Sequence, residues 1–322
     1  MWVSEVMAQQ TRIDVALRYF EPFVTAFPDL RALASASSDD VTARWSGLGY
    51  YRRARMLREG AADVAARFGG VIPSTVEQLQ SIAGIGRYTA GAIASIAFDR
   101  HAPVVDGNVA RILARLDGIE QPAGSPALMR AAWIRAEELV RACDSPRKFN
   151  QGLMELGALI CKPANPSCEV CPLTKYCAAF QQSRTAELPL PKARARSHEM
   201  RLPLYLITDS DGRILMRRES GKLMTGLFHL PHGDSALLPG VPLRVERRES
   251  LGTFRHTVTT RRIEFELFAA TLADAVADDE SYAWIDAERI DRVPHPSYVA
   301  KALRMARRHG TAPTASKSAS RK

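Results

Sequence analysis

Four of the five cysteines lie close together, in the stretch CKPANPSCEVCPLTKYC. Their spacing is C-x6-C-x2-C-x5-C, formed by Cys161, Cys168, Cys171 and Cys177. Zinc sites usually combine two close pairs across a longer loop, whereas four thiolates in one short loop suit a cluster whose irons each take one sulfur. The spacing therefore predicts a four-iron, four-sulfur (4Fe–4S) cluster, with zinc and unligated thiols as the alternatives.

A pair of glycines interrupts the stretch IAGIGRYTAGAI. Gly84 and Gly86 lie between a predicted helix over residues 75–82 and a second helix beginning near Arg87. Such a corner can bind one DNA phosphate, because the second helix begins with unpaired N–H groups. A glycine cap followed by a tight turn is the structural alternative.

The elements that must position these residues are helices first and strands later. Apolar residues recur at three- and four-residue steps over residues 1–180, which predicts successive helices. Residues 181–200 carry two prolines and three arginines without periodicity and predict a linker. Beyond it, RLPLYLIT, RILMRR and RRIEFELFAA indicate strands, DSDG a turn and PSYVAKALRMARR a closing helix. Residues 201–309 are therefore predicted to form a smaller α+β domain, and residues 310–322 are expected to be a disordered tail.

Composition favours an anionic partner. The net charge of +9 favours nucleic acid over a membrane surface, although simple solubility would also explain it. No apolar run is long enough to span a bilayer, and charged residues occupy the first turns, so we expect neither a membrane segment nor a signal peptide. Clustered cysteines fit a reducing compartment better than a disulfide framework. We expect a cytoplasmic, nucleoid-associated protein that is a monomer.

The cysteine spacing at the end of a helical domain resembles the endonuclease III superfamily of base-excision DNA glycosylases. The segments SEVMAQQT, GLGYYRRAR, IAGIGRYTAGAI, DGNVARIL and NQGLMELGALIC resemble, within it, the MutY-type adenine glycosylases. The likeness covers residues 1–180 closely and residues 201–270 more weakly. It implies an all-α helix-hairpin-helix domain with a 4Fe–4S loop at 161–177, followed by an α+β Nudix-like domain. The cluster would be mainly structural.

The resemblance assigns catalytic roles to four residues. Glu5 would protonate the leaving adenine, and Asp106 would stabilise the cationic sugar, because breaking an N-glycosidic bond is served by one neutral and one ionised carboxyl group. Asn108 would orient Asp106 or the water. Tyr88 stands where bifunctional relatives carry a nucleophilic lysine, which predicts a monofunctional enzyme. Without the resemblance, these residues have ordinary structural interpretations. Glu5 would be an exposed helix residue, Asp106 the N-cap of the next helix, and Tyr88 a packing residue.

Further residues match family positions that bind DNA. Gln151 would contact the edge of the extruded adenine. The residues that would wedge the duplex and touch 8-oxoguanine are Gln10, Thr11, Leu48 and Tyr50. For Leu48 and Tyr50, an ordinary core position is the alternative.

The second domain departs from the family pattern. It has no complete glutamate-rich Nudix box after PHGD, so we expect recognition and no pyrophosphate hydrolysis. The family's Phe-Ser-His loop, which checks for 8-oxoguanine, reads Val258, Thr259, Thr260 here, so Thr259 keeps a hydroxyl while the aromatic ring and the imidazole are missing. The family also has a segment before the residues that match WVSEVM, so we expect this chain to lack it.

Together these observations predict an enzyme that releases adenine mispaired with 8-oxoguanine or guanine in double-stranded DNA. One alternative is a bifunctional pyrimidine-lesion glycosylase of the endonuclease III kind. The other is a catalytically silent iron–sulfur protein that binds DNA.

Overall fold

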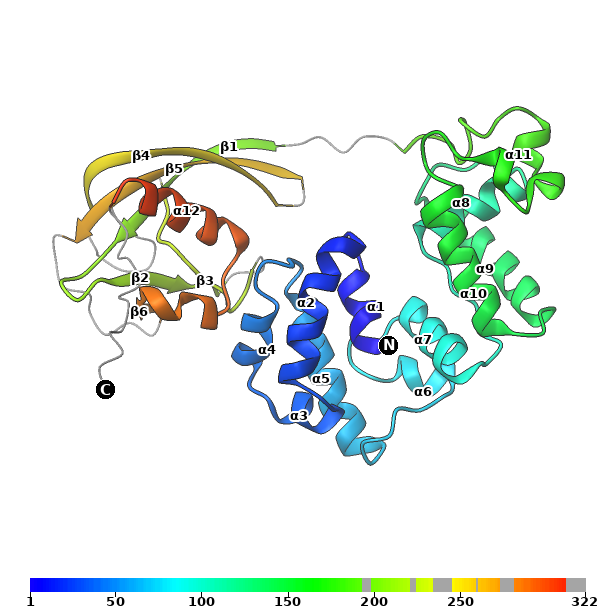
Figure 1. The fold of residues 1–322 in the computed structure, drawn as a ribbon, viewed down its shortest axis with the longest axis horizontal. Coiled ribbons are helices and arrows are strands. Elements are labelled where there is room, and N and C mark those ends of the chain that lie inside the picture. The colour runs from blue at the N-terminus through cyan, green and yellow to red at the C-terminus, as the bar shows by residue number, and fades with distance from the viewer. Residues whose placement is uncertain (193–197, 221–223, 234–244, 259, 273–280, 311–322) are drawn as a thin grey trace, which may run out of the picture. The chain divides into compact units, whose positions relative to one another are not determined.

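The computed structural model describes residues 1–192, 198–220, 224–233, 245–258, 260–272 and 281–310. The chain forms two compact units. The first comprises Met1–Arg12, Asp29–Ala34 and Met56–Arg194, and the second comprises Ile13–Pro28, Ser35–Arg55 and Ala195–Lys322. Figure 1 shows helices over the first half of the chain and strands towards its end. This order confirms the predicted all-α portion followed by an α+β portion, while the predicted boundaries at 180, 200 and 309 stay predictions.

The first unit consists of helices. They are α1 (Trp2–Ala8), α3 (Leu30–Ser35), the greater part of α5 (Arg52–Arg67), α6 (Val76–Gln80), α7 (Arg87–Ala92), α8 (Gly107–Leu116), α9 (Pro126–Arg141), α10 (Pro146–Glu155) and α11 (Ala178–Gln181). Two π-helical turns, η1 (Ile93–Ala97) and η2 (Leu156–Ile160), extend α7 and α10, and two 3-10 turns, η3 (Cys168–Val170) and η4 (Thr174–Tyr176), shape the cysteine stretch. None of the helices described in either unit has the length and apolar character to cross a membrane.

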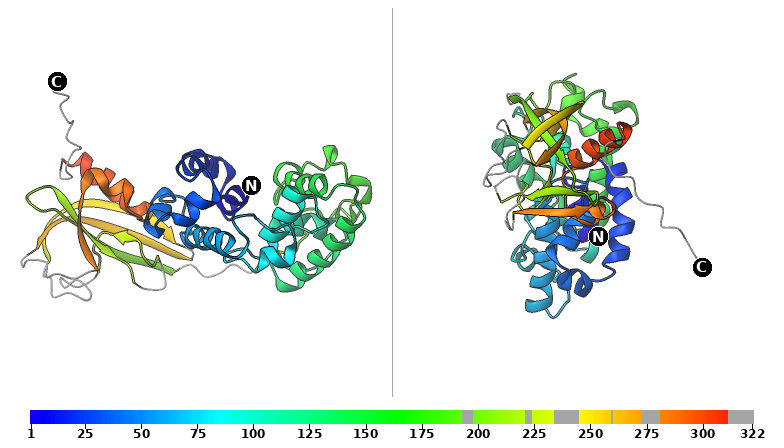
Figure 2. Two further views of the ribbon diagram at one scale, coloured as in Figure 1. Left: turned by 90° about the horizontal axis from the view of Figure 1, so that it is seen from below. Right: turned by 90° about the vertical axis from the view of Figure 1, so that its left-hand side faces the viewer.

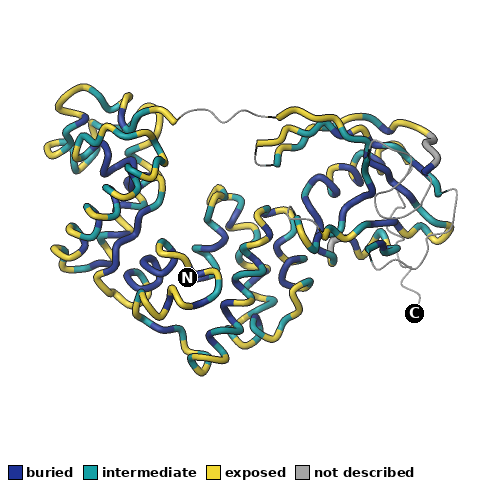
Figure 3. The backbone as a smooth tube through the Cα atoms, turned by 180° about the vertical axis from the view of Figure 1, so that it is seen from behind, coloured by how far each residue is buried: buried dark blue, intermediate teal, exposed yellow. Residues whose placement is uncertain are grey.

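Helix α8 is the centre of this unit. Every residue from Val109 to Arg115 is buried, and its apolar side chains pack against α9, α10 and η2. Figure 3 shows buried stretches running through these helices. Because close-packed cores resist displacement, a central helix of this kind holds the side chains of its first turn in fixed positions.

Part of the predicted linker packs onto the first unit. Leu188 is 1 % exposed, and Leu190 forms a parallel bridge with Pro122. Arg184 pairs with Glu120 and Glu187. Within 181–200, residues 193–197 lie outside the described residues, as do residues 311–322 of the predicted tail.

The second unit combines helices with strands. Its helices are α2 (Ile13–Ala26), α4 (Ser38–Arg44), the 3-10 turn η5 (Ala287–Arg292) and α12 (Ser297–Arg308). Its strands are β1 (His198–Ile207), β2 (Arg213–Arg218), β3 (Phe228–His229), β4 (Val245–Val258), β5 (Arg261–Leu272) and β6 (Tyr282–Asp286). They form two three-stranded sheets, β1-β5-β4 and β3-β2-β6, with β1 parallel to β5 and the other pairs antiparallel. Figure 2 shows both sheets from two further directions.

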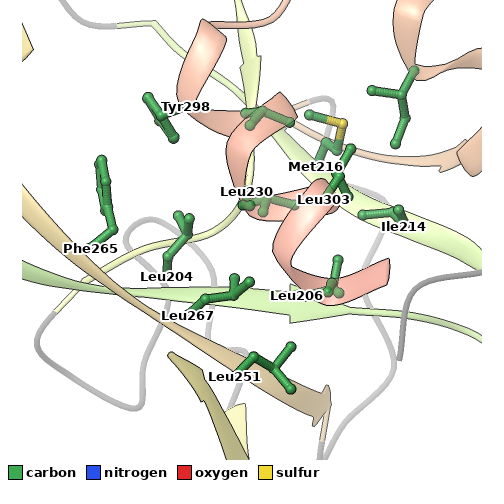
Figure 4. Packing of buried hydrophobic residues seen from close by; sticks show 14 of the residues in the cluster. Leu204, Leu206, Ile214, Met216, Leu230, Leu251, Phe265, Leu267, Tyr298 and Leu303 are labelled. Carbon is green, nitrogen blue, oxygen red and sulfur yellow. The ribbon is translucent and has the colours of Figure 1, made fainter. Parts of the chain in front are cut away.

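Both sheets share a core with α12. Leu204 and Leu267 come from the first sheet and Met216 from the second, and they meet Tyr298 and Leu303 of the helix (Figure 4). The predicted strands over RILMRR and RRIEFELFAA and the predicted closing helix are confirmed.

Candidate active site and cysteine pocket

Glu5 and Tyr88 form a hydrogen-bonded pair in the first unit. Glu5 lies on α1, where its side chain is half-buried, and Tyr88 lies in the first turn of α7. The Tyr88 hydroxyl donates to Glu5 Oε2 at 3.0 Å. Burial raises the pKa of Glu5 above its ordinary value. The hydrogen bond from Tyr88 and the positive amino group of Met1 oppose this rise, and the charge of Asp106 adds to it. The carboxyl group is therefore biased towards its protonated form.

Asp106 is held by the start of α8. Its side chain accepts from the backbone N–H groups of Asn108 at 2.8 Å and Val109 at 2.7 Å, and from Asn108 Nδ2 at 3.1 Å. This confirms the predicted N-cap and orients the carboxylate. The charge of Asp106 also raises the pKa of Tyr88, after burial and Glu5. Glu5, Tyr88 and Asp106 therefore lie within electrostatic range of one another, with Asn108 beside them.

A glycine lets η2 approach this carboxylate closely. A Cβ atom added at Gly157 would lie 2.8 Å from the Cβ of Asn108 and 3.3 Å from Ile112 Cδ1. A contact of 2.8 Å is shorter than real Cβ atoms show, so a side chain at residue 157 would force η2 and the first turn of α8 apart. Gly157 therefore helps to place Asp106 without touching it.

The predicted glycine hairpin joins α6 to α7. Gly84 adopts φ +79°, and an added Cβ would lie 2.7 Å from Met56 Cβ, so only glycine suits this position. Gly86 is the N-cap of α7, with φ −84° and no atom near an added Cβ. Gln9 Nε2 donates to Thr89 Oγ1 at 3.0 Å, which ties the end of α1 to the same helix.

The four clustered cysteines line one pocket, together with Arg115, Thr174 and Phe180. Burial raises the pKa of the Cys168 thiol, and its neighbours Cys161, Cys171 and Cys177 raise it further. Across the described residues, no group of three or more histidine, cysteine, aspartate or glutamate side chains is arranged to hold a single metal ion. Four thiols around a shared pocket are nonetheless the donor set that a 4Fe–4S cluster requires, so the residues present fit that group.

Two buried arginines hold the cysteine stretch, and sequence reasoning did not identify them. Arg115 donates to the carbonyl oxygens of Leu188 (2.8 Å), Lys162 (2.7 Å) and Pro163 (3.1 Å), and to Cys161 Sγ at 3.2 Å. Arg111 donates to the carbonyl oxygens of Cys161 and Gly157, both at 2.8 Å. Their spacing of four residues on α8 was the available signal, but arginine is rarely buried and the pattern suggests a solvated face.

The other predicted DNA-contacting residues are distributed over both units. Gln10 follows α1, is exposed and has φ +52°, and Thr11 is half-buried. Gln151 is exposed on α10. In the second unit, Leu48 is only 6 % exposed, in line with the core alternative, whereas Tyr50 is 52 % exposed. Thr259 lies outside the described residues.

Comparison with known proteins identifies the helical part. Residues 3–137 match the HhH-GPD superfamily of base excision DNA repair proteins. The chain is 47 % identical over 189 residues to an adenine DNA glycosylase of Mus musculus, a match that covers 58 % of this chain and 36 % of the mouse protein. It is 34 % identical over 237 residues to an adenine DNA glycosylase of Buchnera aphidicola subsp. Schizaphis graminum (strain Sg), which covers 74 % of this chain and 68 % of that protein. The chain thus spans about a third of the mouse relative's length.

One solved structure agrees with the fold of the helical part. A thermostable thymine-DNA glycosylase matches with a TM-score of 0.50 and 25 % identity, covering 56 % of this chain and 83 % of that one. The sheet-containing C-terminal region resembles the MutT protein of Methanosarcina mazei Go1 at a TM-score of 0.29 and 17 % identity, covering 36 % of this chain and 99 % of that one.

Proposed function

Because the chain belongs to the MutY-type adenine DNA glycosylases of the helix-hairpin-helix superfamily, we propose that it hydrolyses the N-glycosidic bond of adenine in duplex DNA. Its substrate is adenine mispaired with 8-oxoguanine or guanine. The enzyme acts as a monomer at the nucleoid and leaves an abasic site.

The observation that carries the proposal is the pairing of a protonation-prone carboxyl group with a fixed carboxylate. Glu5 donates its proton to a ring nitrogen of the departing adenine, and the bond to the sugar breaks. Asp106 stabilises the positive charge that develops on the sugar. The Glu5 carboxylate then takes a proton from water while the hydroxide adds to the sugar carbon, which restores the acid.

Tyr88 supports the monofunctional reading. A phenol hydrogen-bonded to Glu5 cannot form the imine through which an amine nucleophile leads to strand cleavage. Its role in the proposed reaction is to hold the Glu5 carboxyl group and limit the rise of its pKa.

Binding and recognition rest on the remaining predicted residues. Gly84 and Gly86 present the hairpin backbone to a phosphate, and Gln151 contacts the extruded adenine. The duplex is wedged by Gln10, Thr11 and Tyr50, with Leu48 supporting the loop from the core. Thr259 remains our candidate for contact with 8-oxoguanine. Cys161, Cys168, Cys171 and Cys177 would hold a 4Fe–4S cluster, which would brace this part of the fold and take no part in bond cleavage.

The test is adenine release from a duplex with one A:8-oxoguanine pair, compared between the wild type and Asp106→Asn. We expect release by the wild type only, with strand breaks appearing only after alkaline treatment. Borohydride trapping of the wild type on lesion DNA would favour the bifunctional alternative. Binding without release by both proteins would favour the silent DNA-binding alternative.

A further inference from the structure

The loop before α5 presents Tyr50 in an unusual backbone conformation. Tyr50 has φ +50°, the left-handed region that a bulky side chain rarely adopts. The residue is nevertheless 52 % exposed, so its burial does not offset the cost of this conformation. Something else in the loop must hold the residue there.

Arg53, in the first turn of α5, contacts both the backbone and the ring of this loop. Its Nη2 donates to the carbonyl oxygen of Gly49 at 3.1 Å, and its backbone N–H donates to the carbonyl oxygen of Tyr50 at 2.9 Å. Its guanidinium carbon lies 5.4 Å from the centre of the Tyr50 ring, a cation–π distance. One side chain thus fixes the peptide before Tyr50 and the ring of Tyr50 itself.

Trp45 contacts both the same guanidinium group and the same carbonyl group. Its ring is fully buried, packs edge-to-face on Phe23 at 5.6 Å, and lies 5.4 Å from the same guanidinium carbon. Its Nε1 donates to the Gly49 carbonyl oxygen at 3.1 Å, which therefore accepts two hydrogen bonds. Burial lowers the pKa of Arg53 to about 10, so the guanidinium stays protonated at neutral pH.

We propose that Arg53 is the positioning residue for Tyr50, holding its ring exposed in the pose in which it enters the DNA stack. The inference rests on the proposed function for the role of Tyr50 in DNA. It goes beyond that function because it makes Arg53, a residue that need not touch the nucleic acid, responsible for the orientation of the Tyr50 ring. The guanidinium suits this position because it keeps a cation–π distance to two rings while it donates to a carbonyl group.

The experiment compares Arg53→Met and Arg53→Lys with Arg52→Met in the full chain. Arg52 is exposed in the same helical turn, so Arg52→Met controls for the loss of one cation near DNA. In protein labelled with 3-fluorotyrosine, the 19F signal of Tyr50 is assigned by its absence in Tyr50→Phe. We expect this signal to move in both Arg53 variants and to stay in place in Arg52→Met, with thermal unfolding reporting on folding.

On A:8-oxoguanine duplex, Arg53→Met should lower the single-turnover rate of adenine release about tenfold, as expected for losing a cation–π contact and a charged hydrogen bond. In a Tyr50→Leu background the same substitution should cost less than about twofold, because the ring that it positions is gone. Arg53→Lys should recover part of the rate. Equal losses in both backgrounds, or an unmoved 19F signal, overturn the inference. If the wild type releases no adenine, the proposed function fails, and the 19F comparison alone decides the role of Arg53.

Discussion

At the scale of single residues, the Glu5 carboxyl group is subject to opposing influences. Burial and the Asp106 charge favour its protonated form, and the Tyr88 hydroxyl favours its ionised form. A proton donor must be protonated at working pH and still release its proton, so the balance between these influences sets the useful pH range.

Tyr88→Phe should shift that range. Removing the hydroxyl removes the contribution that lowers the pKa of Glu5, so this pKa rises further. Because the protonated acid is the active form, the rate should persist to higher pH before it falls. Single-turnover rates of adenine release, measured as a function of pH, give this alkaline limb of the pH–rate profile. A limb that stays in place or moves to lower pH would contradict the assignment of Glu5 as the acid.

Asp106 combines a structural and a chemical role, and two substitutions separate them. Asn retains the cap, so Asp106→Asn should leave the free energy of unfolding nearly unchanged while lowering activity about 10²–10³-fold. Asp106→Ala should lose the same activity and about 1 kcal/mol of stability. Chemical denaturation and single-turnover kinetics give both quantities. Activity in Asp106→Asn close to the wild type would rule out the electrostatic role.

The sequence was enough to select Glu5, Tyr88 and Asp106 as candidate site residues, but it did not predict their burial or their contacts with one another. Asp106 was predictable as an N-cap, since Asp before Gly-Asn-Val begins a helix. The half-burial of Glu5 and its hydrogen bond to Tyr88 could not be predicted, because both depend on contacts between residues that are far apart in the chain. A lone glutamate on a predicted helix suggests only an exposed position.

At the scale of elements, the cysteine stretch depends on α8. Arg115 is 3 % exposed and bonds three carbonyl oxygens and one sulfur around that stretch, a set that only a forked guanidinium can satisfy. The loop therefore has a protein framework of its own besides any cluster that it holds.

Arg115→Lys should reduce the free energy of unfolding by about 2–4 kcal/mol, because several buried acceptors lose their donor. Chemical denaturation of the purified protein measures it. Arg135→Lys is the matched control: within the described part of the chain, Arg135 forms ion pairs at the surface with Asp117 and Glu138, so the loss should stay within about 1 kcal/mol. Equal effects of the two substitutions would show that the buried fork is not needed.

A second element-scale prediction concerns β3 and the residues after it. Burial lowers the pKa of His232 to about 4, and the stacked His229 at 4.9 Å contributes. The unfolded chain takes up this proton near pH 6.5, whereas the folded chain does so only near pH 4. Stability is therefore fully present above pH 6.5 and falls as pH decreases through this window.

Between pH 6.5 and 5 the loss attributable to His232 should be about 2 kcal/mol. Urea unfolding of the wild type and His232→Gln at both pH values measures it. The variant should lose less stability than the wild type over this range. Parallel losses would mean that other groups cause the acid sensitivity.

Sequence periodicity predicted most helices and the strands β1, β2 and β5, but not β3, β4 or β6, of which β4 is the longest. The segment VERRESLGTFRHTV is highly charged and contains Gly252, so its apolar pattern is weak. Pairing with β5 along its length, through two register shifts, makes it a strand. Tertiary pairing of this kind overrides local preference, and a local reading cannot detect it.

At the scale of the whole molecule, the net charge of +9 accords with a partner that carries many phosphates. If about 6–10 phosphates are contacted, affinity for duplex DNA should fall about 10³–10⁵-fold between 50 and 200 mM salt. Fluorescence anisotropy with an A:8-oxoguanine duplex measures this slope. An affinity that hardly changes with salt would argue against phosphate contacts as the main source of binding.

The contact between Gly157 and Asn108 also affects how genetic surveys of this protein would be interpreted. In a mutator screen that scores every substitution, residue 157 would rank with the acidic pair even though it never meets the substrate. Gly152, which precedes it by five residues, has open space around an added Cβ and would accept alanine without loss of packing. The positions that tolerate no substitution would therefore include residues such as Gly157, which hold the backbone that positions the reactive groups, as well as the reactive residues themselves.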